Sequence, residues 1–359
     1  MLRSRTSGPV ADYGARRRPR SRLRRVITVA ATLVATAALL TATEQSAAAQ
    51  DPAVEPLPSP GCAAPAPASG GSMLGFAAPG KSGSYIRDLP PGADHPLPLV
   101  LDLHGYLEPA LLEHDSTGFG AYGMSQGFIT ITPQLDEPGV PRWDFGEGSL
   151  DSDYLSQLLT HVESTVCVDT RRVYVTGLSM GGFTTSSLGC QFSERIAAIA
   201  PVAGLQDFEW CRTSRPVPVI AFHGTADPIV AYEGGLGPNA RLLPSPDGTG
   251  SADRGAGAEP EVNGPGPQSI TANAAAWARR NGCDGGDPAE VWVAPDVALR
   301  SYPCPARGEV QLYSLIGAGH VWPGTSAAYF PAPLVGANTT SIQATRVIWE
   351  FFRAHPMRG

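Results

Sequence analysis

A serine flanked by two glycines follows the apolar run VYVT, in the five residues GLSMG at 177–181. Gly-x-Ser-x-Gly between a strand and a helix is typical of a turn that presents a strained serine hydroxyl as a nucleophile. Side chains two residues before and two after the serine would clash in such a turn, which explains the glycines. The same pattern arises by chance in glycine-rich chains, so the strand before it and the expected helix Gly182–Cys190 carry the inference. We therefore expect Ser179 to attack a carbonyl carbon.

A serine hydroxyl is a weak nucleophile and needs a base within hydrogen-bond reach, itself oriented by a third group. Asp227 follows the strand-like run VPVIAF, although an aspartate before proline is also a common turn residue. Two histidines lie beyond it: His320 in the glycine-rich loop GAGHVWPG, and His355 at the end of the last helix. The order serine, acid, histidine predicts Ser179 as nucleophile, His320 as general base and then acid, and Asp227 as the carboxylate that fixes the imidazole tautomer.

Acyl transfer through a serine also needs backbone amides that stabilise the negatively charged oxygen of the tetrahedral intermediate. The amide of Met180, the residue after the nucleophile, is one expected donor. The second is expected in the loop that ends the early run LPLVLDLHGYLEP, from Tyr106, with Leu107 as the alternative. His104 in this loop is interpreted as a structural histidine that hydrogen-bonds locally.

Two tryptophans are candidates for the substrate pocket: Trp322, two residues after His320, and Trp143 in the run PRWDFGEG. Buried packing is the more common role of tryptophan and is the alternative for both. The chain has no phosphate-binding GxxxxGK[ST] motif and no GxGxxG after a strand, so no cofactor is expected. The expected chemistry requires no metal.

Apolar runs alternate with helical patterns along the chain, and several of the runs lack polar alternation, as in strands buried on both faces. The expected strands are Leu97–Leu103, Phe128–Thr132, Val173–Thr176, Ile196–Val202, Val217–Phe222 and Val310–Leu315. The expected helices are Leu150–Ser164, Gly182–Cys190, Ile270–Arg280 and Ser341–Ala354. This alternation predicts an α/β fold with a mostly parallel central sheet and helices on both faces.

The N-terminal segment combines the basic stretch RRRPRSRLRR with an uncharged apolar run that leads to Ala47-Ala48-Ala49. It is interpreted as a secretory signal peptide, residues 1–49, because the run is too short and too rich in Ala and Thr for a membrane span. Residues 50–72, rich in Pro, Ala and Gly, are expected to form an extended leader to a catalytic domain at 73–359. Within that domain, the Gly/Pro-rich stretch 232–268 is expected to be a long loop, either near the site entrance or a tolerated surface insertion.

Removal of the signal peptide, with its nine arginines and two acidic residues, would leave 17 basic and 31 acidic side chains, a net charge of −14. Such a surface repels phosphate backbones and anionic membranes, so nucleic-acid partners are not expected. Six cysteines in an exported chain suggest three disulfides. Proximity along the chain favours Cys190 with Cys211 and Cys283 with Cys304, which leaves Cys62 for Cys167. The sequence does not indicate an oligomeric state.

Taken together, LDLHGY, GLSMGG, HGTADPIV and GAGHVWPG, with WARRNGC before the last strand, resemble the secreted esterases grouped as polyhydroxybutyrate depolymerase and feruloyl or acetylxylan esterase-like proteins. The resemblance spans about residues 72 to 354 and implies an α/β-hydrolase fold. The family's triad would fall on Ser179, Asp227 and His320. One departure is the Leu-Glu pair after Tyr106, where the family has small polar or glycine residues. The binding module that often accompanies activity on insoluble polymers is absent from this sequence.

These observations predict a secreted serine esterase that acts through an acyl-enzyme on polyester of the 3-hydroxybutyrate type or on feruloyl or acetyl esters of plant cell walls. The substrate would be an ester, polymeric or soluble. A cell-envelope acyltransferase on the same scaffold and a non-catalytic surface binding protein are the alternatives. A peptidase of this fold usually carries an additional gating domain, for which the chain has no room.

Overall fold

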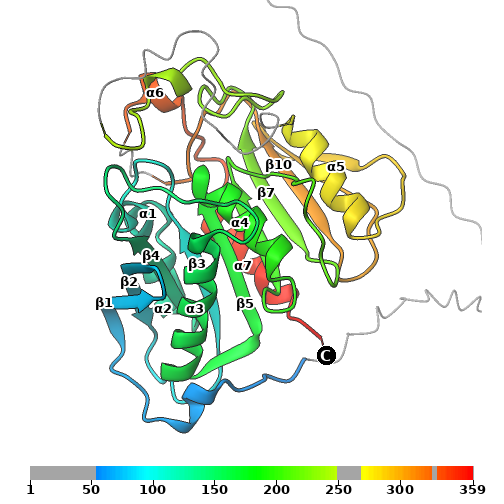
Figure 1. Ribbon diagram of the computed structural model, residues 1–359. Coiled ribbons are helices and arrows are strands. Elements are labelled where there is room, and N and C mark those ends of the chain that lie inside the picture. The colour runs from blue at the N-terminus through cyan, green and yellow to red at the C-terminus, as the bar shows by residue number, and fades with distance from the viewer. Residues whose placement is uncertain (1–53, 249–267, 326–329, 359) are drawn as a thin grey trace, which may run out of the picture. The chain divides into compact units, whose positions relative to one another are not determined.

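A twisted sheet runs through the molecule, and it is built from parallel strands in the middle and antiparallel strands at both edges (Figure 1). The computed structural model describes residues 54–248, 268–325 and 330–358. Within them, ten strands form the order β1-β2-β4-β3-β5-β6-β7-β10-β9-β8. Strands β4, β3, β5, β6, β7 and β10 are parallel neighbours, whereas β1, β2, β9 and β8 pair antiparallel. The mostly parallel sheet expected from the sequence is confirmed.

The strands are β1 (Gly70–Ala78), β2 (Lys81–Leu89), β3 (Leu97–Leu103), β4 (Ile129–Leu135), β5 (Val168–Leu178), β6 (Ala198–Val202), β7 (Val219–Gly224), β8 (Ala289–Ala294), β9 (Val297–Ser301) and β10 (Val310–Leu315). The helices are α1 (Ala110–Thr117), α2 (Phe119–Gln126), α3 (Leu150–Thr165), α4 (Met180–Gln191), α5 (Ile270–Arg280), α6 (Ala332–Val335) and α7 (Ala344–Ala354), with short 3-10 turns at Pro60–Ala63 and Ala240–Leu242.

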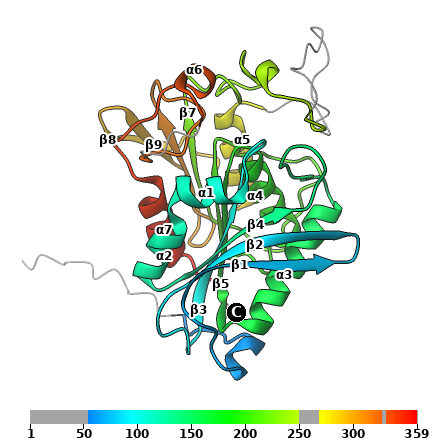
Figure 2. The same cartoon turned by 90° about the vertical axis from the view of Figure 1, so that its left-hand side faces the viewer.

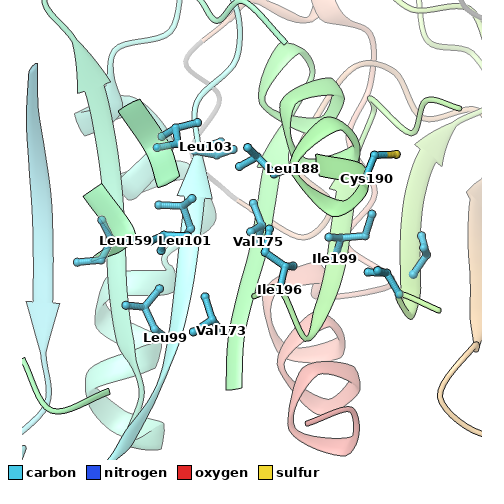
Figure 3. Close-up of a cluster of buried hydrophobic side chains, with 14 of the residues drawn as sticks. Leu99, Leu101, Leu103, Leu159, Val173, Val175, Leu188, Cys190, Ile196 and Ile199 are labelled. Carbon is cyan, nitrogen blue, oxygen red and sulfur yellow. The ribbon is translucent and has the colours of Figure 1, made fainter. Parts of the chain in front are cut away.

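The central strands are buried on both faces because their apolar residues do not alternate with polar ones. In β3, Leu99, Leu101 and Leu103 belong to one core cluster (Figure 3), whereas Val100 belongs to the cluster on the opposite face. Each of these four side chains is 0% exposed. A strand of this composition is stable only between two layers of helices, and the helices provide both layers.

Two sets of helices cover the two faces of the sheet (Figure 2). Helices α3, α4 and α5 contribute Leu158, Leu188 and Trp277 to the first core cluster. Helices α2 and α7 contribute Phe119 and Phe352 to the second. Helix α3 shows how the sequence sets this arrangement, because the apolar residues that recur at helical spacing along it are the ones that it buries: Tyr154, Leu155, Leu158, Leu159 and Val162.

Most expected elements are present with shifted ends. The predicted β3, α5 and β10 have the bounds expected, whereas the helix expected at Gly182–Cys190 begins two residues earlier, at Met180. The hairpin β1–β2, the hairpin β8–β9 and helices α1 and α2 were not expected. The prediction of an extended leader at residues 50–72 is wrong in two places. Residues 70–72 belong to β1, and Pro60–Ala63 form a 3-10 turn.

The parallel pairing places the candidate residues at one edge of the sheet. Strands β3, β5, β6, β7 and β10 lie side by side in the same direction. Their carboxyl ends therefore meet at one edge, where open α/β sheets bind ligands. The loop with Tyr106 follows β3, Ser179 follows β5, Asp227 follows β7 and His320 follows β10.

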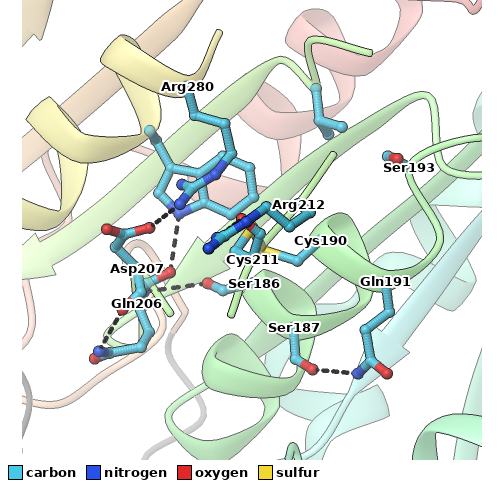
Figure 4. The surroundings of a disulfide bond; sticks show 12 residues. Ser186, Ser187, Cys190, Gln191, Ser193, Gln206, Asp207, Cys211, Arg212 and Arg280 are labelled. Atoms are coloured by element: carbon cyan, nitrogen blue, oxygen red, sulfur yellow. Dashed lines mark hydrogen bonds and ion pairs between the residues drawn. A yellow bond between two sulfur atoms is a disulfide. The ribbon is translucent and has the colours of Figure 1, made fainter. Parts of the chain in front are cut away.

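The three expected disulfides are confirmed: Cys62 with Cys167, Cys190 with Cys211, and Cys283 with Cys304. The second connects the last turn of α4 to the loop after β6 (Figure 4). In that loop, Asp207 forms an ion pair of 2.6 Å with Arg280 of α5. The chain after β6 is thus held by two neighbouring helices.

The bond between Cys62 and Cys167 is expected to contribute most to stability. It joins residues 105 apart, so it restricts the unfolded chain most strongly. We expect replacement of both cysteines by alanine to lower the free energy of unfolding by about 4 to 5 kcal/mol in chemical denaturation. The matched control removes Cys283 and Cys304, which are 21 residues apart, and costs about 3 kcal/mol. An equal or larger loss in the control would contradict the chain-entropy explanation.

The described residues, from 54 onward, form one compact unit. The predicted signal peptide and residues 249–267 of the predicted loop lie outside the described residues. In the described part of the chain, no helix combines the length and hydropathy that crossing a bilayer requires.

Candidate active site

The turn between β5 and α4 holds Ser179 in a backbone conformation that side chains rarely adopt. Its φ is 57° and its ψ is −119°. A non-glycine residue at positive φ costs on the order of 1–3 kcal/mol and persists where the surrounding structure holds it. Two hydrogen bonds hold it here: the Ser179 amide donates to Val202 O at 2.9 Å, and its carbonyl accepts from the Phe183 amide at 3.0 Å. This is the strained geometry that the sequence pattern predicts.

The glycines around the serine are required by close backbone contacts. A Cβ on Gly177 would lie 2.8 Å from the carbonyl carbon of Gly181 and 2.4 Å from Leu103 O. A Cβ on Gly181 would lie 1.9 Å from the same Leu103 oxygen. The clash expected from the sequence is confirmed. The structure adds Gly204, where a Cβ would lie 2.2 Å from Ser179 O and displace the turn.

The loops after β7 and β10 bring Asp227 and His320 together, 93 residues apart in the chain. The distance from His320 Nδ1 to Asp227 Oδ2 is 2.7 Å. The other oxygen, Oδ1, accepts from the amides of Ile229 at 2.8 Å and Val230 at 2.9 Å. The carboxylate is therefore fixed by its own loop, and a proton on His320 Nδ1 points at it, which leaves Nε2 as the basic nitrogen.

Asp227 stays ionised although it is only 6% exposed. Burial alone would raise the pKa of this carboxyl, but the charge and hydrogen bond of His320, together with those of His223, outweigh burial and hold the pKa below its usual value. The ring nitrogen Nε2 of His223 lies 3.2 Å from Asp227 Oδ2 and 2.9 Å from Val230 O. His223 was not expected as part of the site from the sequence.

A cavity beside His320 reaches Leu178, the residue directly before Ser179. The cavity encloses about 140 Å³ and is lined by His320, by Leu178 directly before the serine, and by Glu108. Ser179 lies next to the loop that carries Glu108. The Gly105 amide donates to Glu108, and a Cβ placed on Gly105 would lie 3.4 Å from Ser179 Cβ. Among the hydrogen bonds of the described residues, none joins Ser179 to His320. Their contact stays a prediction, and such bonds often tighten only with substrate bound.

The loop after β3 carries the predicted second amide donor. Leu107, the alternative donor, adopts a φ of 65° and donates its amide to Pro141 O at 2.9 Å. That amide is therefore engaged, and Tyr106 remains the proposed donor. Met180 opens α4, and the amides of the first helical turn have no partner within the helix. Both amide assignments stay predictions.

His104 has the local role expected for it. Its Nδ1 lies 2.8 Å from Gly105 O, and burial lowers the pKa of the ring to about 4, so the ring is neutral. Trp143 packs against this ring at a tilt of 32°, with 4.6 Å between centroids, and donates its indole N–H to His104 O at 2.9 Å. With 3% of its surface exposed, Trp143 supports the loop. The predicted contact of Trp143 with substrate finds no support in this position.

Trp322 lines the cavity beside His320. Its indole N–H donates to Thr345 Oγ1 at 3.0 Å, which fixes the ring against α7. Contact of Trp322 with substrate stays a prediction. The described part of the stretch 232–268 also reaches the site, because the Tyr106 hydroxyl donates to Pro244 O at 2.9 Å. That contact agrees with a loop near the site entrance.

Sequence reasoning missed a group of buried carboxyls next to the elbow: Asp102, Glu108 and Glu113. Glu113 shows no pattern by which it could be found, because acidic residues on a short helix usually face water; Asp102 lies within LDLHGY and Glu108 lies just after it, but the motif assigns them no role. In the described residues, no group of three or more His, Cys, Asp or Glu side chains is arranged to hold a metal ion.

A central sheet of mainly parallel strands between two helical layers, with a serine turn after β5 and a His–Asp pair after β10 and β7, defines an α/β-hydrolase. The solved structure of an acetyl xylan esterase from Aspergillus awamori has the same fold, with a TM-score of 0.51 and 15% identity. The match covers 70% of this chain and 94% of that one. The fold expected from the sequence is confirmed.

Curated relatives extend the comparison to sequence. The bifunctional acetylxylan esterase/xylanase XynS20E of Neocallimastix patriciarum is 34% identical over 136 residues, 38% of this chain and 20% of the relative. Feruloyl esterase B of Piromyces equi is 30% identical over 152 residues, which cover 40% of this chain and 28% of the relative. Poly(3-hydroxyalkanoate) depolymerase C of Paucimonas lemoignei is 29% identical over 131 residues, which cover 33% of this chain and 30% of the relative.

The matched regions span less than a third of each of these relatives. No protein-family model matches the chain. The resemblance to feruloyl esterases, acetylxylan esterases and polyhydroxyalkanoate depolymerases, first inferred from four motifs, is confirmed by these relatives.

Proposed function

We propose that this protein is a secreted serine esterase that hydrolyses acyl esters through an acyl-enzyme. The observation that carries the proposal is the 2.7 Å contact of His320 with Asp227 at the edge of the sheet that also holds the strained Ser179. Relatives named as acetylxylan esterase, feruloyl esterase and depolymerase support the ester as the bond that is cleaved.

In the proposed reaction, Ser179 Oγ attacks the ester carbonyl carbon while His320 Nε2 takes the hydroxyl proton. Asp227 keeps the Nδ1 proton of His320 in place and stabilises the imidazolium. The amides of Met180 and Tyr106 donate to the oxyanion. His320 then gives its proton to the departing alcohol, and water, activated by the same imidazole, releases the acid.

We propose that the acyl group enters the cavity beside His320, which also borders Leu178 directly before Ser179, and that the cavity favours a short acyl group. Its volume of about 140 Å³ is similar to that of an engineered cavity that holds benzene, roughly 150 Å³. An acetyl or a 3-hydroxybutyryl group fits such a space, whereas a feruloyl group, a substituted ring with a further side chain, is larger. We therefore propose acetyl or hydroxybutyryl esters as better substrates than feruloyl esters.

Purified mature protein tests the proposal with acetyl, feruloyl and 3-hydroxybutyrate oligomer esters. We expect hydrolysis of the short acyl esters and covalent labelling of Ser179 by a fluorophosphonate probe. A labelled protein that transfers the acyl group to an added sugar instead of to water would favour an acyltransferase. Absence of both labelling and turnover would favour a binding protein and contradict the proposal.

A further inference from the structure

Two buried carboxyl groups connect the two halves of the proposed oxyanion site. Glu108 Oε2 accepts from the Gly105 amide at 3.0 Å, in the loop that carries Tyr106. Glu113 Oε1 accepts from the Leu178 amide at 3.3 Å, directly before Ser179. The two carboxyl groups also lie close enough to each other for a hydrogen bond between them. One side-chain pair thus spans from the loop after β3 to the nucleophile turn.

Two ionised carboxylates cannot form that bond, because both would be acceptors only. Glu108 is 3% exposed and Glu113 is 0% exposed, so bulk water has little access to the pair. In addition, Glu113 Oε2 is buried with no hydrogen-bond partner among the described residues. A proton on this oxygen resolves both problems, since the resulting O–H donates to the neighbouring carboxyl.

We propose that Glu113 is a protonated positioning residue that, by donating a hydrogen bond to Glu108, fixes the loop of Gly105 and Tyr106 against the turn that carries Ser179. The inference rests on the proposed function, since it assigns the pair a role in aligning the Tyr106 and Met180 amides around one oxyanion. Both glutamates act through backbone amides and contact no reacting atom.

The groups that face the pair support a neutral Glu113. From β3, Asp102 contacts Glu113, and burial raises the pKa of Asp102 to about 7. Burial, together with the charges of Glu108 and Asp102, raises the pKa of Glu113 well above its usual value. On the opposite side, His320 acts on Glu108 and lowers its pKa, although burial leaves the net shift upward. Glu113 is therefore the acid that holds its proton most strongly.

A cation lies beyond the carboxyls and does not neutralise Glu113. His114 of α1 bonds to Asp88 of β2 at 3.0 Å, and this bond raises the pKa of the histidine to about 9. Its charge acts on Asp102, whose Oδ2 also accepts from Thr117 Oγ1 at 2.6 Å. These groups favour the ionised form of Asp102 against the effect of burial, whereas burial and the charges next to Glu113 favour its protonated form.

The sign of the pH effect follows from the raised pKa. Below that pKa, Glu113 is neutral and the bridge is intact. As the pH rises through it, Glu113 loses its proton, the two carboxylates repel each other, and the loop moves away from the nucleophile turn. Wild-type kcat should then fall on the alkaline side. Glu113→Gln keeps a neutral donor and acceptor of the same shape and cannot titrate.

The test combines activity with infrared spectroscopy, because the spectrum does not depend on the protein being an esterase. We expect wild type at pH 7 to show the carbonyl band of buried protonated carboxylic acid, Glu113→Gln to weaken this band to the part contributed by Asp102, whose pKa is about 7, and the exposed control Glu350→Gln to keep it in full. On a p-nitrophenyl acetate substrate, Glu113→Gln should retain kcat within about threefold at pH 7 and lose the alkaline decline. Glu113→Ala should lower kcat by about tenfold or more with little change in KM, as expected of a misplaced oxyanion donor.

Three results would overturn the inference: an unchanged infrared band in Glu113→Gln, a pH profile of this variant that matches wild type, or a wild-type profile with no alkaline decline up to pH ~10. If Glu113→Ala does not fold, Glu113→Gln alone decides the outcome. Failure of the proposed function can be told apart from failure of this inference. If the protein is not an esterase, wild type shows no turnover, but the infrared difference between wild type and Glu113→Gln remains.

Discussion

Replacement of Ser179 by alanine is expected to lower kcat for a short acyl ester by about 10⁴- to 10⁶-fold. The alanine removes the attacking oxygen, and no other residue can form the acyl-enzyme in its place. Substrate binding should change little, since the cavity is lined by Leu178, Glu108 and His320 and not by the hydroxyl. Steady-state kinetics of the purified variant on p-nitrophenyl acetate measure the loss, and a fluorophosphonate probe should fail to label it.

Two further variants separate chemistry from folding. Alanine keeps a Cβ at the φ of 57°, so Ser179→Ala should unfold at nearly the same denaturant concentration as wild type. Ser179→Gly removes the conformational penalty and should be as inactive but more stable by about 1 kcal/mol. The matched control Ser164→Ala changes an exposed hydroxyl on α3 and should keep full activity. Ser179→Ala with turnover within tenfold of wild type would contradict the assignment.

The parts of the fold that the sequence predicted are those with a strong local pattern. Strand β3 is apolar except for Asp102, and nearly all of its residues are buried; helix α5 begins after a capping serine, Ser269, which accepts from the Ala272 amide. The glycines at 177 and 181 follow from sterics within a single turn, which needs no tertiary information. The disulfides followed from proximity along the chain and an even number of cysteines.

Elements that depend on tertiary contacts were missed. Helix α1 buries Glu113, Ser116 and Thr117, so it lacks the apolar stripe by which an amphipathic helix is recognised. Strand β1, with the sequence GGSMLGFAA, is rich in glycine and alanine and lies at the edge of the sheet, where strand propensity gives little signal.

In the candidate site, too, residues marked by a local motif were predicted and residues that act through tertiary contacts were missed. The order of Ser179, Asp227 and His320 could be read from motifs because each follows a strand of one parallel sheet. The neighbours that set their electrostatics could not: His223 begins the motif HGTADPIV and Glu108 lies just after LDLHGY, yet neither motif indicates what these side chains contact, and Glu113 belongs to no motif. Trp143 illustrates the converse, because a conspicuous aromatic residue near the site supports the loop of His104.

Replacement of Asp227 by asparagine is expected to lower kcat by about 10⁴-fold with little loss of structure. The amide oxygen can still accept from Ile229 and Val230, so the loop keeps its shape. The amide nitrogen, however, takes the place of Oδ2 and presents a donor to the Nδ1–H of His320, 2.7 Å away in wild type. His320 then relieves the conflict by moving its proton to Nε2, which removes the base that Ser179 requires.

His223 increases this effect, because its Nε2 also lies 3.2 Å from Asp227 Oδ2. The pKa of Asp227 is lower in the folded protein than in the unfolded chain, where it is ~3.9. The carboxylate charge therefore contributes its full stability above pH ~3.9, and this stability is lost only as the pH falls through the lower pKa of the folded state. Wild-type activity should therefore not decline through protonation of Asp227 near pH 5. Kinetics of Asp227→Asn from pH 5 to 9 test the assignment against Asp94→Asn, which makes the same change at an exposed aspartate 3.3 Å from His95. A loss below tenfold in Asp227→Asn, or an equal loss in the control, would show that this carboxylate does not set the tautomer of His320.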